Sequence, residues 1–534
     1  MVVLAAAWFV AISNVSFWRG FLAGREVNGS NLVLVVATAI VIFGVNFLLL
    51  IPFSFRRVLK PVLTIHLLGA SAASWFIDHF HVYIDMSMIR NVVQTDAREA
   101  GELVTWGMAG WVLATGVAPS ILVWLARFPS GDTIRAWKRR MLMSVVVIVA
   151  MSVSLFAFFS EYASYFRNDH SARYLITPMN YTSSLIRVAL ESQEGRTGER
   201  IVIGQDARLG AAWQDGSRPV VFVLVVGETA RAASFSLNGY ERETNPRLRN
   251  EDIINFPSVY ACGTATADAL PCMFSRFDRD NYSDARGRGY ESLLDVLRHA
   301  GLPVIWLENN SGCKGACNGV ESENLAEAEI PGLCSDGECF DEALLLRTRE
   351  LLEGLQGNLV LVHHQKGSHG PAYYRRYPEA FQRFRPECAS QDFGDCTTEQ
   401  IRNSYDNSIL YTDHVLTELI DMLDSESARF DTAMLYVSDH GESVGEGGLF
   451  LHGLPYSIAP DVQKKVPMIV WLSDGFASRF DLSRDEVRAR SHETISHDHL
   501  FHSVLGLLDV ETTERDPSLD LFSRRRPVRA AAGN

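Results

Sequence analysis

The sequence predicts an N-terminal transmembrane domain of five helices, followed by an α/β domain with a mainly parallel sheet between helices. Three observations support this. Long apolar runs gather in residues 1–160 of the 534-residue chain. From about residue 219 to 515, short Val/Leu/Ile runs alternate with amphipathic stretches, which is typical of a parallel sheet covered by helices. All eight cysteines follow residue 260, as expected if only the second domain lies in an oxidising compartment.

Five apolar runs of about twenty residues, the length that crosses the hydrocarbon core, are predicted membrane spans. They cover roughly residues 2–18, 31–54, 61–80, 105–126 and 141–160. The first is short and could be the apolar part of a signal peptide, but the later spans favour an anchor. Lys and Arg gather in the loops after the second and fourth runs, which places those loops in the cytoplasm and everything after residue 160 outside.

The segments around the two domains are less regular. Residues 84–103 read as a polar outer-face helix, with Asn91, Thr95 and Glu99 on one side. That spacing alone favours a solvated interfacial helix over a wall facing the soluble domain. Residues 161–218 read as a membrane-surface connector and linker, 219–515 as the soluble domain, and 516–534 as a frayed tail.

The cysteines fall into close pairs within polar loops. An even number of them on the outer side predicts four local disulfides. The alternative is a zinc site, because the spacing of Cys313 and Cys317 also suits metal ligands. The predicted pairs are Cys262–Cys272, Cys313–Cys317, Cys334–Cys339 and Cys388–Cys396.

Five strand-like runs of the second domain each end in a polar cluster. In open α/β sheets the ligand crevice lies beyond the carboxyl ends of the strands, so this repeated placement predicts a hydrolase-like metal site. The clusters are Gly227-Glu228-Thr229, Glu308-Asn309-Asn310, His363-His364-Gln365, Ser438-Asp439-His440 and Ser473-Asp474.

Three of these side chains are candidate metal ligands. Asp439 and His440 form an oxygen and nitrogen set that suits zinc. Glu228 follows a hydrophobic strand and needs a compensating cation, either a metal or Arg231, and the neighbouring Asp–His pair favours the metal. A Gly-rich loop returns His452 to the same region, whereas Glu442 is expected to support the loop.

The candidate nucleophile lies in the clamped loop 262–272, which presents two hydroxyls, Thr264 and Thr266. A Thr hydroxyl is a weak nucleophile until a metal or base lowers its pKa. Spacing does not separate the two, and either could cap a helix instead. His364, His369 and Lys314 could contact a second metal or a phosphoryl oxygen, although each taken singly is equally well explained as a surface residue.

Taken together, these motifs closely resemble the lipid A phosphoethanolamine transferases, a family that includes the mobile colistin-resistance enzymes. The resemblance covers almost the whole chain. It rests on Gly227-Glu228-Thr229-Ala230-Arg231, Asn238-Gly239-Tyr240, Cys-Gly-Thr-Ala-Thr-Ala at 262–267, Leu-Pro-Cys-Met-Phe-Ser at 270–275, His-Gly-Pro-Ala-Tyr at 369–373, Tyr-Val-Ser-Asp-His-Gly-Glu-Ser at 436–443 and Leu451-His452-Gly453.

The resemblance implies an alkaline-phosphatase/sulfatase-like fold and a Zn²⁺ cofactor, with a second zinc left open. It selects Thr266 as the catalytic nucleophile. At Lys366 the family usually has an apolar residue, and a cation there could weaken a second zinc or add a phosphate contact. The implied metal ligands are Glu228, Thr266, Asp439 and His440. His364, His369, His452 and Lys314 fall on second-metal or phosphate positions. Asn91, Thr95 and Glu99 fall on substrate-binding positions, which reverses the preference for a solvated helix.

The implied reaction moves phosphoethanolamine from phosphatidylethanolamine to a lipid A phosphate through phospho-Thr, releasing diacylglycerol. The resemblance implies a multi-pass protein of the bacterial inner membrane with its catalytic domain in the periplasm. The expected partners are the donor lipid, a lipid A or lipopolysaccharide acceptor and membrane lipids. A monomer is expected, and the net charge of −14 argues against nucleic acid.

Three alternatives differ in acceptor or in class. They are transfer to a lipopolysaccharide core sugar, a glycerol-phosphate polymerase of the teichoic-acid type, and a membrane sensor that only binds lipid A. The presence of Glu228, Thr266 and Asp439 with His440 argues against the sensor, because a binding module does not need a full set of reacting groups.

Overall fold

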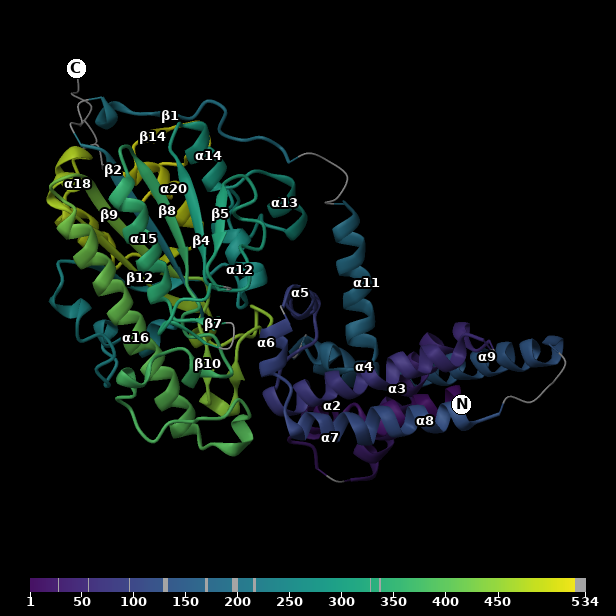
Figure 1. Ribbon diagram of the computed structural model, residues 1–534. Coiled ribbons are helices and arrows are strands. Elements are labelled where there is room, and N and C mark those ends of the chain that lie inside the picture. Colours follow the sequence, from purple (N-terminus) through teal and green to yellow (C-terminus); the bar gives the residue numbers. More distant parts are fainter. Residues whose placement is uncertain are drawn as a thin grey trace, which may run out of the picture. The chain divides into compact units, whose positions relative to one another are not determined.

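The chain folds into two units, each with its own core. The computed structural model describes residues 1–26, 28–55, 57–95, 97–127, 133–168, 171–194, 200–214, 218–326, 328–335 and 338–523. One unit comprises Met1–Val93 and Leu103–Leu190, and the other comprises Gln94–Glu102 and Glu191–Asn534. In Figure 1 the first is the purple and blue helical unit, and the second contains the sheet. The predicted connector divides between them, because its helix α11 (Met179–Glu194) groups mostly with the helical unit.

The helical unit carries the candidate membrane spans. Within the described residues, three helical stretches are long and apolar enough to cross a membrane: Gly29–Phe53, Trp106–Leu125 and Trp137–Ala157. The bent pair α1 (Val2–Ile12) and α2 (Val15–Leu22) would make a fourth. The predicted count of five is therefore not confirmed. The third predicted span is helix α4 (Leu59–Phe80), which is 22 residues long but interrupts its apolar run with His66 and Asp78.

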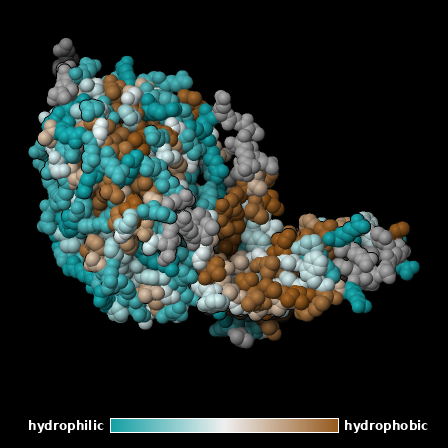
Figure 2. Space-filling view, in the orientation of Figure 1, coloured by the Kyte–Doolittle hydropathy of each residue, from teal (hydrophilic) through white to brown (hydrophobic). Residues whose placement is uncertain are grey.

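Large apolar side chains are exposed mainly on this unit. Leu122, Leu125 and Val146, for example, each expose more than half of their surface. In Figure 2 the helical unit is largely brown, whereas the visible face of the sheet unit is largely teal. An apolar surface of this extent is what a membrane-embedded helical unit presents to lipid.

Within the described residues, the second unit is built on an eight-stranded sheet of order β13-β3-β12-β9-β2-β8-β4-β5. Strand β12 runs antiparallel to both neighbours, and the other neighbouring pairs are parallel. The predicted mainly parallel sheet is thus confirmed with one reversal. The strands are β13 (Ile495–Ser496), β3 (Ile254–Tyr260), β12 (Lys465–Leu472), β9 (Asp431–Ser438), β2 (Val220–Gly227), β8 (Leu359–His364), β4 (Val304–Glu308) and β5 (Glu321–Asn324).

The reversal of β12 removes one of the five predicted polar clusters from the site. Because β12 is antiparallel to β9, its carboxyl end lies at the opposite edge of the sheet from Asp439. Ser473 there caps helix α18 (Asp474–Arg479) by accepting a hydrogen bond from the backbone N–H of Phe476. The other four clusters follow β2, β4, β8 and β9, which are mutually parallel.

Helices cover both faces of the sheet. Helices α14 (Leu293–His299) and α20 (Asp498–Leu507) pack against alternate strand residues such as Phe222 and Leu224. Helices α15 (Glu342–Gly354) and α16 (Thr398–Ser425) lie together over the sheet in Figure 1. Leu521 and Phe522 belong to the core, so the predicted tail is not frayed up to Ser523, and residues 524–534 lie outside the described part.

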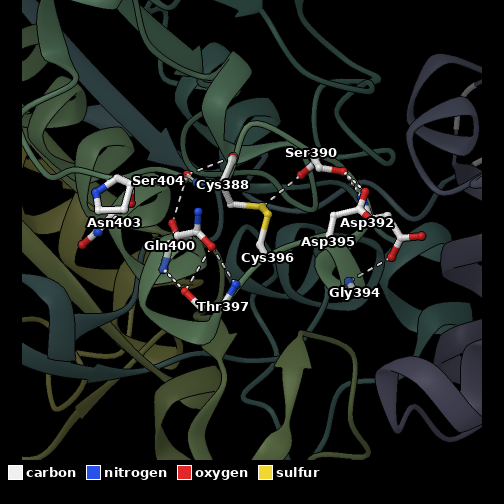
Figure 3. Close-up of a disulfide and its surroundings, with 11 residues drawn as sticks. Cys388, Ser390, Asp392, Gly394, Asp395, Cys396, Thr397, Gln400, Asn403 and Ser404 are labelled. Carbon is white, nitrogen blue, oxygen red and sulfur yellow. Dashed lines mark hydrogen bonds between the residues drawn. A yellow bond between two sulfur atoms is a disulfide. The ribbon is translucent and has the colours of Figure 1, made fainter.

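Helix α16 begins after a loop that is closed by a disulfide. The side chain of Thr397 and that of Gln400 form a capping box at its first turn. The disulfide Cys388–Cys396 closes the preceding loop, and the backbone N–H of Cys388 donates to Ser404 Oγ at 2.8 Å (Figure 3). This arrangement fixes the start of a helix whose Tyr405 hydroxyl donates to the carbonyl of Thr229, next to Glu228.

Candidate active site

The ends of two neighbouring strands bring two candidate ligands together. Strands β2 and β9 are parallel, with Gly227 opposite Ser438, so Glu228 and Asp439 follow directly after paired residues. The backbone N–H of Asp439 donates to the carbonyl of Gly227 at 2.9 Å, which continues the ladder by one residue. Both carboxylates are fully buried. Their meeting point is the carboxyl edge of the sheet, as the sequence predicts.

His440 completes a cluster that fits a cation. The ligand atoms of Glu228, Asp439 and His440 all lie within 4.8 Å of one another. Oδ1 of Asp439 accepts from the backbone N–H groups of Thr229 and His440, whereas its buried Oδ2 has no hydrogen-bond partner in the structure. Buried carboxylate oxygens are normally paired, so this oxygen fits a metal ligand. Two carboxylates and an imidazole form a donor set suited to zinc.

Burial and mutual charge set the protonation of this cluster. Burial, and then the charge of Glu228, raises the pKa of Asp439 to about 6. Burial would raise the pKa of Glu228 too, but the hydrogen bond and charge of His440 hold that pKa well below its usual range. Burial lowers the pKa of His440, yet the two carboxylates outweigh it and raise that pKa to about 10. A metal that binds Nε2 of His440 would displace the proton from that nitrogen.

Thr266 lies against the same cluster. Its Oγ1 is 3.1 Å from each carboxylate oxygen of Glu228 and 3.2 Å from Nε2 of His440. Thr266 is the first residue of helix α12 (Thr266–Met273), whose N-terminal N–H groups favour an anionic group at this point. A hydroxyl between a carboxylate and an imidazole is placed to give up its proton and act as a nucleophile.

Thr264 has a different role in the structure. Its Oγ1 donates to the carbonyl of Leu454 at 2.6 Å, which ties the nucleophile loop to the Gly-rich loop carrying His452. The hydroxyl contacts of the two threonines thus separate them, which their spacing in the sequence does not. All eight cysteines are paired, in the disulfides Cys262–Cys272, Cys313–Cys317, Cys334–Cys339 and Cys388–Cys396.

The outer histidines gather beside the cluster. The ring centroids of His440 and His452 are 4.4 Å apart, and those of His452 and His369 are 6.0 Å apart. His364 ends strand β8, which pairs with β2, and its Nδ1 contacts Glu308. Whether these histidines bind a metal or a phosphoryl group stays a prediction.

Two further residues join parts of the site, and the sequence assigned neither a role. Asn310 Nδ2 donates to Glu228 Oε2 at 2.7 Å and lies 3.4 Å from His364 Nε2. In the sequence, only the place of Asn310 in a strand-end cluster indicates a role in the site. His497 accepts from the backbone N–H of Cys262 at 3.1 Å, and its Nε2 lies 3.0 Å from the carbonyl of Ser438. A single His ahead of a helix gives no signal in the sequence.

The two candidate lysines have other partners. Lys314 donates to the carbonyl and hydroxyl of Ser311 and to the carbonyl of Gln94. Lys366 forms an ion pair with Glu338 at 3.1 Å. A phosphate contact by Lys314 stays a prediction, and the cation at position 366 is balanced by a carboxylate instead of facing the cluster unpaired.

The predicted substrate-binding residues belong to different units, Asn91 to the helical unit and Thr95 and Glu99 to the sheet unit. Asn91 lies on helix α5 (Met86–Gln94), and Thr95 follows it. Glu99 lies on helix α6 (Ala97–Glu102), but its side chain is outside the described residues. Their role in binding substrate stays a prediction.

Comparisons with known proteins identify the family of the chain. The family described as Sulfatase matches residues 221–510, and the family described as Phosphoethanolamine transferase EptA/EptB matches residues 41–192. Phosphoethanolamine transferase EptA of Escherichia coli (strain K12) is 37% identical over 533 residues, 98% of this chain and 96% of that protein. Phosphatidylethanolamine transferase Mcr-1 of Escherichia coli is 33% identical over 96% of this chain and 94% of that protein.

A solved structure matches over both units. The integral membrane protein lipooligosaccharide phosphoethanolamine transferase A from Neisseria meningitidis superposes with a TM-score of 0.94 at 33% identity, covering 98% of each chain. With the apolar helices, this match makes the protein a membrane protein with a periplasmic-type sulfatase domain. The chain belongs to the EptA family of phosphoethanolamine transferases, within the alkaline phosphatase/sulfatase superfamily.

Proposed function

We propose that this chain transfers phosphoethanolamine from phosphatidylethanolamine to a lipid A phosphate through a covalent phospho-Thr266 intermediate. The reaction takes place at the bacterial inner membrane, with the catalytic domain in the periplasm. The observation that carries the proposal is the position of Thr266 Oγ1, 3.1 Å from both carboxylate oxygens of Glu228 and 3.2 Å from His440 Nε2. The names of the EptA and Mcr-1 relatives support the transferred group.

The transfer takes two displacements at one phosphorus. Thr266 Oγ1 forms a bond to the donor phosphorus as the bond from phosphorus to the diacylglycerol oxygen breaks in line. The proton that the Thr266 hydroxyl gives up ends on the departing diacylglycerol oxygen. A lipid A phosphate oxygen then attacks the same phosphorus, and Thr266 Oγ1 leaves with the proton that the lipid A phosphate group gives up.

The cluster residues would hold the cofactor. A zinc ion held by Glu228, Asp439, His440 and Thr266 would lower the pKa of the hydroxyl and offset phosphoryl charge. The outer groups His364, His369, His452 and Lys314 stabilise phosphoryl oxygens or hold a second metal. Asn91, Thr95 and Glu99 bind substrate on the outer side of the membrane. A lipid A phosphate that carries phosphoethanolamine is less anionic and binds cationic peptides such as polymyxins less well.

The two threonines of one loop provide a matched test. We expect lipid A from cells expressing the wild-type chain or Thr264→Ala to carry phosphoethanolamine by mass spectrometry, and lipid A from Thr266→Ala cells to lack it. Thr264→Ala removes one loop hydrogen bond, which costs about 1 kcal/mol of stability. Purified wild-type chain incubated with donor lipid alone should yield a peptide that carries phosphoethanolamine on Thr266.

Two results would contradict the proposal in different ways. Full activity of Thr266→Ala would exclude the covalent mechanism. Phosphoethanolamine found on core sugars, with lipid A phosphates unmodified, would leave the mechanism standing and exclude the acceptor.

A further inference from the structure

Two buried carboxylates each contact Nδ1 of one outer histidine, His364 or His452. Glu308 Oε1 lies 2.9 Å from Nδ1 of His364, and Glu442 Oε2 lies 3.4 Å from Nδ1 of His452. Glu442 and His364 are fully buried, and Glu308 is 6% exposed. We propose that Glu308 and Glu442 are positioning residues that fix His364 and His452 in the tautomer with the proton on Nδ1, so that each Nε2 lone pair is presented to the reacting group. This inference rests on the proposed function.

A carboxylate specifies the tautomer because it can only accept hydrogen bonds. A neutral imidazole has one donor and one acceptor nitrogen, so the nitrogen beside an ionised carboxylate must carry the hydrogen. Turning the ring over would place a carbon against the carboxylate and leave a buried charge without its donor. That loss is costly in a buried site, so each pair also fixes the direction of the ring.

Glu308 is itself held in place. It ends strand β4 directly opposite His364 in the parallel pairing of β4 with β8. Its Oε2 accepts from the indole Nε1 of Trp306 at 2.7 Å, and its Oε1 accepts from the backbone N–H of Asn310 at 2.8 Å. The contacts with Trp306, Asn310 and His364 hold this carboxylate in one orientation. The carboxylate in turn orients the imidazole of His364.

Nε2 of His364 faces the cluster, whereas the ring of His452 packs beside that of His440. Nε2 of His364 lies 3.4 Å from Asn310 Nδ2, the same amide that donates to Glu228. The ring of His452 lies 4.4 Å from that of His440, measured between centroids. With Nδ1 of each ring taken by a carboxylate, Nε2 is the atom left for a metal or a phosphoryl oxygen.

The acceptor differs between the inner and outer histidines. Nδ1 of His440 lies 2.9 Å from a backbone carbonyl, that of Gly441, whereas Glu308 and Glu442 are carboxylates. A carboxylate acceptor makes the opposite nitrogen of the ring a stronger electron donor than a neutral carbonyl does. Residues that orient a ligand in this way typically contribute 10–100-fold to activity or metal affinity.

A double-mutant cycle on the full-length chain in detergent tests the first pair. Activity is measured with phosphatidylethanolamine and lipid A for Glu308→Leu, Glu308→Gln, His364→Gln and Glu308→Leu/His364→Gln. We expect Glu308→Leu to lower kcat by roughly 10–100-fold with little change in the KM for donor lipid. Glu308→Gln should lose less, because its amide oxygen still accepts from Nδ1. The double variant should be no less active than His364→Gln alone.

The same cycle on Glu442 and His452 tests the second pair, and Asp295→Asn is the matched control. Asp295 is also a fully buried carboxylate, but its partners are Arg200 and Ser292. We expect Asp295→Asn to keep wild-type kcat, and thermal unfolding to show that each variant is folded. If Glu308→Leu does not fold, the cycle is completed with Glu308→Gln, His364→Gln and the double variant Glu308→Gln/His364→Gln.

Failure of the inference is distinguishable from failure of the proposed function. If the losses from Glu308→Leu and His364→Gln multiply in the double variant, Glu308 does not act through His364 and the inference is overturned. If His364→Gln keeps full activity while Thr266→Ala has none, the inference is overturned and the transfer mechanism stands. Full activity of Thr266→Ala overturns both.

Discussion

At the scale of single residues, two fully buried carboxylates lie side by side without enough compensating charge. Burial and the charge of Glu228 raise the pKa of Asp439 to about 6, well above its ordinary value of 3.8. At neutral pH the folded chain therefore holds Asp439 ionised at a cost. Raised pKa values of this kind concentrate at functional sites.

Removing that charge should stabilise the metal-free protein. For Asp439→Asn we expect a higher free energy of unfolding in chelator at pH 7, by about 1–3 kcal/mol, since one pKa unit corresponds to about 1.4 kcal/mol. Thermal unfolding in excess chelator measures this. The same variant should lose most of the stabilisation that added zinc gives the wild type. A less stable variant in chelator would show that Asp439 is not strained.

His497 should make the folded state sensitive to acid. Burial lowers its pKa to about 4, whereas the unfolded chain has the ordinary value of 6.5. Between these pH values the unfolded state binds a proton that the folded state does not, so stability is present above pH 6.5 and falls as pH drops to 4. The slope is at most about 1.4 kcal/mol per pH unit.

Comparing wild type with His497→Gln isolates this contribution. We expect the variant to be less stable at pH 7, because it alters a link between Cys262 and Ser438, but to lose less stability on acidification. The measurement is the thermal unfolding midpoint at several pH values from 7 to 4.5. Parallel pH profiles for the two proteins would contradict the prediction.

At the scale of elements, the turn after β8 has little room for a side chain. Gly367 has a φ of +53°, and a Cβ there would lie 2.7 Å from the carbonyl oxygen of Glu228. Ser368 also donates its backbone N–H to that carbonyl at 3.0 Å. The turn therefore holds the backbone of a candidate metal ligand, and a larger residue has to push that backbone aside.

Substituting this glycine should impair the site from outside the cluster. For Gly367→Ala we expect a stability loss of about 1–3 kcal/mol from strain, and a fall in activity of roughly tenfold or more through displacement of Glu228. Gly357→Ala is the control, because its Cβ would meet no atom within 4 Å and no positive φ is required there. Equal activity of the two variants would contradict the argument.

The strand ends could be predicted because burial leaves a clear mark in a sequence. Continuous apolar runs such as 220–226 identify buried strands, and the polar residues that follow identify the ligand edge. Strand direction leaves no such mark, since β12 reads as the same kind of run but lies antiparallel to its neighbours. Position in the sequence therefore groups Ser473 with the strand-end clusters, although the sequence assigns it no role in the site and indicates only a turn. Contacts between distant segments, such as His497 with Cys262, depend on the folded chain alone.

At the scale of the whole molecule, the two units have separate cores. Residues such as Phe222 and Val437 belong to the sheet core, whereas Phe9 and Phe47 belong to a core of the helical unit. The candidate metal ligands lie only in the sheet unit. Binding of a metal should therefore stabilise one unit, because a ligand stabilises the structure that it binds.

Chelation should act on one unit only. We expect treatment with a zinc chelator to lower hydrogen-exchange protection around residues 227–231, 262–273 and 436–445, with recovery on zinc addition. Protection in helix α3 (Gly29–Leu50) should not change. Peptide-resolved hydrogen exchange in detergent measures both units in one sample, and equal loss in both would contradict a metal confined to the sheet unit.

The composition of the helical unit explains why its span count was hard to predict. Helix α4 carries polar groups that are satisfied inside the unit, since Asp78 accepts from the backbone N–H and the hydroxyl of Ser16. Such polar residues lower the mean hydropathy of a helix, although their partners inside the unit allow the helix to lie in a membrane. A count based on hydropathy and length registers the polar side chains but not their partners.

The parallel pairing of β2 with β9 also sets the separation between the backbones of two candidate metal ligands. Neighbouring strands lie about 4.8 Å apart, set by backbone hydrogen bonds and not by the side chains at their ends. Glu228 and Asp439 follow such paired strands, so their backbones keep this separation whether or not a cation lies between them. The separation between these two backbones is therefore a property of the sheet. Core substitutions in these strands that keep the backbone pairing should therefore leave selectivity among metal ions of different radius unchanged.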